Sequence, residues 1–177
     1  MAEIVNNSNL KSMEYVPYAL SWMVHLQAIV FTPYTSFHES VFTVKYFREI
    51  FILSDGENIA LDWFEEPKPQ GKELKNEKRP LLVCIGGLGG GQQATYMKPV
   101  MHKARKMGYQ IVYLHFRATG DMPVTTDKIH CMLSWQDIKE PSDYLFQKYC
   151  KNQGRSMYLY GVSLGATMQT HYLINDD

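Results

Sequence analysis

The sequence has few cysteines, no excess of charge of either sign and no long unbroken apolar run. Its three cysteines, Cys84, Cys131 and Cys150, are odd in number and far apart, which indicates reduced thiols rather than a disulfide framework. Lys and Arg together number 18, as do Asp and Glu, so the formal net charge is zero. A neutral chain lacks the positive field that captures nucleic acid. We therefore expect a cytoplasmic protein without a nucleic-acid partner.

The N-terminal region lacks the patterns of a secretory signal and of a membrane-spanning helix. Residues 1–11 contain no basic stretch followed by an apolar one. Residues 18–31 are apolar, but three polar residues interrupt them and Pro33 follows soon after. A membrane span needs about 20 apolar residues in a row. We expect this segment to pack on a soluble domain, while attachment to a membrane surface stays open.

The apolar pattern from residue 45 onward predicts one α/β domain. A chain of 177 residues, of which 45 % are hydrophobic, is long enough for a single core. Two β-prone runs, 47–53 and 59–63, are joined by a polar turn and predict a hairpin, and a solvated loop follows over 65–80. Further on, we predict strands over 81–85, 110–115 and 157–160, and helices over 96–107, after Ser134 and after Gly165. This alternation is typical of a mostly parallel sheet with helices on both faces.

The predicted helix after Ser134 has a start signal and an internal proline. Ser134 and Asp137 have the spacing of a capping box, in which each side chain caps a backbone N–H of the first turn. Pro141 lies seven residues beyond Ser134 and cannot donate a helical hydrogen bond. We therefore expect either a kink at Pro141 or a later start of the helix.

The pentapeptide Gly161-Val162-Ser163-Leu164-Gly165 directly follows the apolar run 157–160. A G-x-S-x-G pattern between a strand and a helix predicts a nucleophile elbow, a tight turn that holds a serine hydroxyl clear of the sheet. Ser163 is then the nucleophile. We expect its backbone to be strained, and we expect Gly161 and Gly165 because side chains there would collide across the turn. The N–H of Leu164, at the helix N-terminus, is available for a developing oxyanion.

A second glycine cluster, residues 86–91, lies between a predicted strand and a predicted helix, where phosphate-binding loops also occur. A P-loop is excluded, because Gln92 stands where it requires lysine. The dinucleotide fingerprint G-x-G-x-x-A does match at Gly89, Gly91 and Ala94. However, no acidic residue ends the following strand to bind the ribose. Dinucleotide binding remains an alternative.

The same loop has a different role in enzymes that contain a nucleophile elbow. There the loop after the third strand supplies the second N–H of the oxyanion hole, and glycines let the backbone approach the substrate closely. Leu88 is the candidate for this donor. One hypothesis, an acyl-transferring serine enzyme, thus accounts for both glycine clusters, which neither nucleotide hypothesis does.

Together these residues resemble one branch of the α/β-hydrolase superfamily, which contains the YheT-like esterases and the abhydrolase-domain lipases and phospholipases. The resemblance extends from about Trp22 to the end of the chain, with departures at Gly86, Ala118 and Pro141. Its motifs, in chain order, are His25-Leu26-Gln27, Asp55-Gly56, Leu61-Asp62-Trp63, Gly87-Leu88 with Gly90-Gly91 and Tyr96, Phe116-Arg117 with Pro123, Thr126 and Ile129, Trp135-x-Asp137-Ile138, and Gly161 to Gly165.

The resemblance implies an N-terminal segment over 1–44 and part of an α/β-hydrolase domain over 45–177, without the C-terminal strands. It also implies a serine hydrolase of carboxylic esters or acyl lipids that requires no metal or other cofactor. Its partner is then a small ester or acyl-lipid substrate. The histidines show no spacing typical of a metal site either.

The sequence after Ser163 lacks the rest of a catalytic triad. In this fold the acid and the histidine base follow the nucleophile, but here only His171, Asp176 and Asp177 do. His171 lies eight residues along the predicted helix, about 12 Å from the serine along its axis, and His115 is a poor substitute. We therefore expect the chain as given to be nearly inactive. The alternative is a non-catalytic binding or assembly module, with self-association through the strand 157–160, whose far edge lacks a partner.

Overall fold

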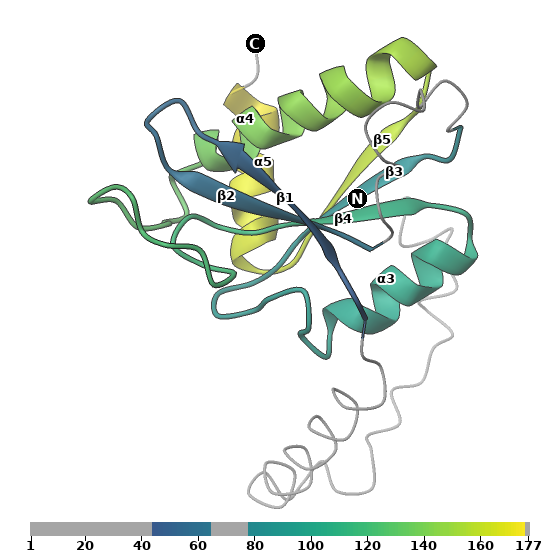
Figure 1. Cartoon of the computed structure of the whole chain (residues 1–177), viewed down its shortest axis with the longest axis horizontal. Helices are drawn as coiled ribbons and strands as arrows, with labels where there is room; N and C mark the ends of the chain where they lie inside the picture. Colours follow the sequence, from purple (N-terminus) through teal and green to yellow (C-terminus); the bar gives the residue numbers. More distant parts are fainter. Residues whose placement is uncertain (1–43, 65–77, 176–177) are drawn as a thin grey trace, which may run out of the picture. The chain divides into compact units, whose positions relative to one another are not determined.

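The computed structural model describes residues 44–64 and 78–175 (Figure 1). All of these residues belong to one unit, which spans Val41–Asp177. The His25-Leu26-Gln27 motif, the apolar segment 18–31 and most of the loop 65–80 lie outside the described residues. The division into a segment 1–44 and a domain 45–177 therefore stays a prediction.

The described strands form one mixed sheet, and all the strands expected from the sequence are confirmed. The order across the sheet is β1-β2-β4-β3-β5, in which β1 pairs with β2 and β2 with β4 in antiparallel fashion, while β4, β3 and β5 are parallel. The strand bounds are Phe47–Ile52 (β1), Asn58–Trp63 (β2), Leu81–Ile85 (β3), Gln110–Leu114 (β4) and Met157–Gly161 (β5). The β1–β2 pair is the predicted hairpin.

The helices cover both faces of this sheet, as the alternation of the sequence predicts (Figure 1). They are α3 (Met97–Lys106), α4 (Gln136–Leu145) and α5 (Leu164–Asn175). One hydrophobic cluster joins α4 and α5 to side chains such as Val83 and Ile85 of β3. The other joins α3 to Cys84 of the same strand. Successive residues of a strand point to opposite faces, so the continuous apolar run of β3 is buried on both.

The capping box predicted at Ser134 is wrong. Trp135 is the N-cap residue of α4, and no side chain caps the helix. The hydroxyl of Ser134 instead lies 3.1 Å from Sγ of Cys131. The carboxylate of Asp137 is bound by the guanidinium of Arg117 through two hydrogen bonds of 2.7 Å. A charged partner from a distant loop thus outcompetes a local capping contact, because a bidentate Arg–carboxylate pair is the stronger interaction.

α4 begins at Gln136 and continues through Pro141, so the proline does not delay the helix to a start beyond it. The regular helix ends at Leu145 and gives way to a π-helical turn over Phe146–Cys150 and a short 3₁₀ turn over Lys151–Gln153. Gly154, with φ of 62°, then ends the segment. The sequence signals did not indicate the π turn.

Within residues 44–64 and 78–175, no helix is long and apolar enough to cross a membrane.

Candidate active site

The loops that follow β3, β4 and β5 lie along one edge of the sheet, because these strands are parallel. The glycine-rich residues 86–91 follow β3, His115 follows β4, and Ser163 follows β5. The topology therefore brings both glycine clusters to the same edge. The question is which of the side chains there can act on one another.

Ser163 occupies the turn between β5 and α5 in a conformation that is rare for a residue with a side chain. Its φ is 51°, in the left-handed region, and its side chain is exposed. Such a conformation costs about 1–3 kcal/mol and persists only where its surroundings enforce it. Here the Val162 N–H donates to the Ile85 carbonyl at 3.0 Å, and the Thr167 N–H donates to the Ser163 carbonyl at 3.0 Å. The turn is thus fixed on both sides of the serine.

A side chain is excluded at each of the two glycines that flank the turn, but by different neighbours. A Cβ at Gly161 would lie 2.7 Å from the backbone nitrogen of Ala166, so here a side chain would collide across the turn, as the sequence predicts. A Cβ at Gly165 would lie 2.5 Å from the Gly86 carbonyl oxygen, at the end of β3. The Gly165 N–H also donates to that oxygen at 3.1 Å. Gly165 is therefore needed because the glycine-rich loop comes close, rather than because of the turn itself.

The glycine-rich loop passes directly beside Ser163. A Cβ at Gly87 would lie 3.3 Å from Cβ of Ser163. The Gly87 N–H donates to the hydroxyl of Tyr96 at 3.1 Å, and the Gly90 N–H donates to the Gly87 carbonyl at 3.0 Å. The loop thus folds back on itself next to the serine and is held there by a tyrosine.

Two tyrosines explain why the loop contains so many glycines. A Cβ at Gly86 would collide with the hydroxyl of Tyr113, and a Cβ at Gly90 would collide with the hydroxyl of Tyr96. Tyr113 also donates to the Gly90 carbonyl at 3.3 Å. No pattern in the sequence indicates the role of Tyr113, which is one position in an apolar, buried strand. Tyr96 was indicated only as part of the family motif.

The predicted oxyanion donors are both available. Among the described residues, neither the Leu88 N–H nor the Leu164 N–H donates a hydrogen bond. The side chain of Leu88 is 75 % exposed, so it does not contribute to the core. Leu164 is the first residue of α5, where helical N–H groups have no partner within the helix.

His115 lies after β4 but is bound to a carboxylate on the side away from β5. Its Nε2 lies 2.8 Å from Oδ2 of Asp62 on β2, and both side chains are only 1 % exposed. Arg48 of β1 binds the same carboxylate at 2.7 and 2.8 Å. Burial alone would raise the pKa of Asp62, but the hydrogen bonds from Arg48 and His115 outweigh it and lower that pKa to about 2. Asp62 is therefore ionised, and it fixes the ring of His115 within the fold.

No histidine among the described residues contacts Ser163, whose hydroxyl makes no hydrogen bond there. The ring of His130 stacks on Phe116, and its Nδ1 lies 3.1 Å from the carbonyl oxygen of Arg117. His171 is on α5, eight residues after the serine and about 12 Å along the helix axis. His25 and His38 lie outside the described residues. Within residues 44–64 and 78–175, no group of His, Cys, Asp and Glu could hold a metal ion.

A buried carboxylate holds the long loop between β4 and α4 against the hairpin. Glu57, which is fully buried, accepts hydrogen bonds from the hydroxyls of Thr125 and Thr126, each at 2.8 Å. Arg117 joins the same region through Asp55, at 3.0 Å, in addition to its pair with Asp137. Asp55, Arg117, Thr126 and Asp137 belong to the family motifs, and their contacts here hold the loop against the hairpin.

A sheet of this topology that presents a strained serine between a strand and a helix is typical of the α/β-hydrolase class of proteins. No protein-family model matches the chain. The curated relatives include embryogenesis-associated protein EMB8 of Picea glauca, which is 30 % identical over 80 % of this chain and 31 % of the relative. Phospholipase ABHD3 of Mus musculus is 25 % identical over 73 % and 31 %, and YheT of Escherichia coli is 28 % identical over 73 % and 36 %.

Solved structures agree on the fold. The chain matches the lidless α/β serine hydrolase XC6422 of Xanthomonas campestris with a TM-score of 0.54 and 14 % identity, over 75 % of this chain and 57 % of that one. It matches the esterase Pf2001 of Pyrococcus furiosus with a TM-score of 0.52 and 20 % identity, over 73 % and 44 %. The chain therefore belongs to the α/β-hydrolase superfamily, in the branch of the YheT and abhydrolase-domain proteins. It spans about a third of the length of the curated relatives it matches.

Proposed function

We propose that the chain carries the nucleophile portion of a serine hydrolase that cleaves carboxylic esters or acyl lipids. Ser163 Oγ attacks the carbonyl carbon of the ester and forms a tetrahedral intermediate, while the hydroxyl proton passes to the base of the triad. The N–H groups of Leu88 and Leu164 stabilise the negative oxygen of that intermediate. An acid and a base complete the triad from sequence that is not part of residues 1–177.

The observation that carries this proposal is the conformation of Ser163 beside the glycine-rich loop. A serine with φ of 51° is strained, and it is exposed at the edge of the sheet where the backbone of Gly87 passes within contact distance. A turn that served only as a connection would not require the strain. An exposed hydroxyl next to available N–H groups is what attack on a carbonyl and stabilisation of its oxyanion need.

The descriptions of the relatives support a broad class of substrate. Curated relatives are described as a phospholipase, a medium-chain fatty acid ethyl ester synthase/esterase and a monoacylglycerol lipase. All three descriptions name esters of fatty acids or phospholipids. We propose an acyl ester as the substrate of the protein to which this chain belongs, and no cofactor takes part in the mechanism.

Labelling with a fluorophosphonate probe tests the role of Ser163 in the protein isolated from its native source. We expect stoichiometric labelling at Ser163, loss of labelling in Ser163→Ala, and no loss in Ser156→Ala, which removes another exposed serine just before β5. An enzyme that hydrolyses esters without reacting with the probe, or that reacts at another residue, would refute the proposal.

The second candidate is a non-catalytic module that keeps the fold without the chemistry. It is favoured by one observation: no described histidine contacts Ser163. Loss of the base alone reduces turnover by a factor on the order of 10⁶ in a serine hydrolase. A native protein with the 20.5 kDa mass of this chain that fails to react with the probe would support this candidate over the first.

Dinucleotide binding is the remaining alternative from the sequence. α3 begins only at Met97, three residues after the last position of the fingerprint, and the hydroxyl of Tyr96 occupies the inside of the loop. If the alternative held, NAD or NADP at millimolar concentration would raise the melting temperature. We expect no shift.

A further inference from the structure

The glycine-rich loop is bound on both sides of its tip, which consists of Leu88 and Gly89. The Gly90 N–H donates to the Gly87 carbonyl at 3.0 Å and closes a tight turn around these two residues. Gly89 has φ of 69°, which glycine adopts without strain. Neither Leu88 nor Gly89 makes a backbone hydrogen bond within the described part of the chain. The orientation of the tip is therefore set by the bonds at the ends of the turn.

The peptide between Gly87 and Leu88 carries the N–H that the proposed function requires. A trans peptide is planar, so its carbonyl and its N–H point in opposite directions. The carbonyl of this peptide, on Gly87, points into the turn towards the Gly90 N–H. The Leu88 N–H therefore points out of the turn. A contact that fixes Gly87 also fixes the direction of this donor.

The hydroxyl of Tyr96 is such a contact. It accepts the Gly87 N–H at 3.1 Å, and this is its only hydrogen bond to the described residues. A Cβ at Gly87 would lie 3.5 Å from this hydroxyl and 3.3 Å from Cβ of Ser163, so Gly87 lies next to both the tyrosine and the serine. Gly87 is thus bound through its N–H by Tyr96 and through its carbonyl by Gly90.

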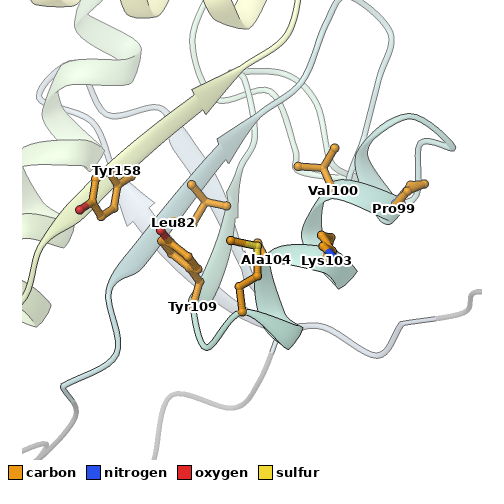
Figure 2. A pocket seen from close by; sticks show the side chains of 8 residues that line it. Leu82, Pro99, Val100, Lys103, Ala104, Tyr109 and Tyr158 are labelled. Atoms are coloured by element: carbon orange, nitrogen blue, oxygen red, sulfur yellow. The ribbon is translucent and has the colours of Figure 1, made fainter. Parts of the chain in front are cut away.

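The position of Tyr96 is set by the helix that it precedes. Tyr96 is the N-cap residue of α3, and this helix buries Met97 and Met101 completely. Farther along the helix, Val100 lines a hollow together with Leu82 of β3 (Figure 2). The hydroxyl that binds Gly87 therefore belongs to a residue next to a helix packed on the sheet. A group that holds a catalytic donor in place needs such rigid support.

We propose that Tyr96 is a positioning residue of the oxyanion hole. By binding the Gly87 N–H, its hydroxyl holds the peptide that carries the Leu88 N–H in the direction in which this donor meets the oxyanion. The inference rests on the proposed function, in which Leu88 is one of two donors. The negative oxygen exists only in the tetrahedral intermediate and in the transition states on either side of it. Loss of the positioning therefore lowers kcat and leaves KM unchanged.

Hydrolysis of a p-nitrophenyl ester by the full-length protein tests the proposal with Tyr96→Phe, which removes the hydroxyl and keeps the ring. Because a misplacement of about 1 Å can cost about 100-fold in rate, we expect kcat to fall by about 10- to 100-fold and KM to stay within about twofold. The matched control is Tyr46→Phe, whose hydroxyl donates to the Gln92 carbonyl at 2.8 Å, beyond the turn. It should change neither constant by more than about twofold. An unchanged kcat in Tyr96→Phe, or an equal loss in the control, would overturn the proposal.

A thionoester of the same acid and alcohol separates a disturbed oxyanion hole from a general loss of structure. In this substrate the negative charge of the intermediate lies on sulfur, which accepts hydrogen bonds only weakly. The donors therefore contribute less to its hydrolysis, and we expect Tyr96→Phe to hydrolyse it within about threefold of the parent rate. A loss of the same factor with the oxygen ester and with the thionoester would contradict a role through the donors.

Amide hydrogen exchange, followed by mass spectrometry of peptides that contain residues 86–91, measures the contact without any turnover. The exchange should be faster in Tyr96→Phe than in the parent and unchanged in Tyr46→Phe. Unchanged exchange in Tyr96→Phe would overturn the proposal even in an active enzyme. Failure of the proposed function has a different result. A full-length parent that neither hydrolyses esters nor reacts with fluorophosphonate at Ser163 would refute that function and the catalytic role of Tyr96, while faster exchange in Tyr96→Phe would still confirm the contact with Gly87.

Discussion

Gly165 is the residue at which the two glycine clusters meet. Its missing Cβ leaves room for the carbonyl oxygens of Gly86 and Ile85, which would lie 2.5 and 2.7 Å from it. Both are backbone atoms at the end of a buried strand, so neither can move without displacing β3. The glycine-rich loop can thus lie beside Ser163 only because residue 165 has no side chain.

Gly165→Ala should therefore destabilise the protein by about 2 kcal/mol, in the range for forced overpacking of a core. Urea denaturation followed by circular dichroism measures this. Gly91→Ala, in the glycine-rich loop, is the control, because a Cβ there meets nothing within 4 Å. We expect the control to change stability by less than about 1 kcal/mol. Equal losses in both variants would show that the close approach to β3 is not the cause.

The lowered pKa of Asp62 leads to a prediction about the stability of the protein at low pH. Its pKa is lowered to about 2 by Arg48 and His115 despite burial, against about 3.9 in an unfolded chain. A group with a lowered pKa stabilises the folded state above the unfolded pKa, and this contribution is lost as the pH falls from about 4 towards 2. The shift corresponds to about 2–3 kcal/mol.

Asp62→Asn should flatten the fall in stability between pH 4 and pH 2, measured as urea midpoints at several pH values. It should also lower stability at pH 7, because Arg48 and His115 lose their shared carboxylate. Asp127→Asn, which changes an exposed carboxylate without a described partner, serves as the control and should leave the pH profile as it is. A parallel pH profile in Asp62→Asn would contradict the assignment.

The π turn after α4 connects this helix to the sheet. A π turn has a wider repeat, in which residues five apart come to one side. Tyr144 and Tyr149 are five apart, and both donate to the carboxylate of Glu49 on β1. Trp63 Nε1 and Lys148 Nζ donate to the same carboxylate at 2.9 and 2.7 Å. The irregular helix end thus fastens α4 to the edge strand β1.

Glu49→Gln should release this contact. Burial alone would raise the pKa of Glu49, but its donors outweigh burial and lower it, so the carboxylate is the form that the site accepts. An amide has one acceptor oxygen for four donors, and we expect a loss of about 2–3 kcal/mol in urea denaturation. Glu140→Gln, whose carboxylate binds only Ser54 among the described residues, should cost less than about 1 kcal/mol. A smaller loss in Glu49→Gln than in Glu140→Gln would contradict this account.

Strands and helices were predictable where a local sequence pattern determines them. Continuous apolar runs such as 81–85 became strands, and Gly108, with φ of 89°, follows the end of α3. The absence of a capping box at the start of α4 was not predictable, because Asp137 is bound by Arg117, twenty residues earlier in the chain. No local rule contains that contact. The π turn was not predictable either, because its side chains bind the carboxylate of Glu49, which lies on β1 and far away in the sequence.

The described part of the chain contains the serine and both glycine clusters of the candidate site, but no histidine there contacts the serine. The sequence predicted that Ser163 and both glycine clusters belong to one site. The parallel strands do bring the two clusters to the same edge of the sheet. Tyr96 and Tyr113 were not predictable as supports of the loop, since their hydroxyls reach it only through the fold. The roles of Ser163, Leu88 and Leu164 stay predictions.

The 177-residue chain alone should hydrolyse a p-nitrophenyl ester slowly, since no described histidine contacts Ser163. We expect Ser163→Ala to reduce this rate by less than about tenfold, against a factor on the order of 10⁶ in a serine hydrolase with its complete triad. A steady-state assay with p-nitrophenyl butyrate measures both. A large loss in Ser163→Ala would instead indicate a base outside the described residues, and His25→Ala and His38→Ala would then identify it.

The strand order also determines when β3 can gain its second neighbour during synthesis. β3 ends at Ile85, but its outer neighbour β5 begins only at Met157. At about 5–20 residues per second, a ribosome needs several seconds to produce the intervening segment. During that time one side of the central strand is exposed, and the hairpin and β4 can form before it is covered. The nascent chain is therefore vulnerable to aggregation from the time that Ile85 emerges until β5, just before the serine-bearing turn, has been made.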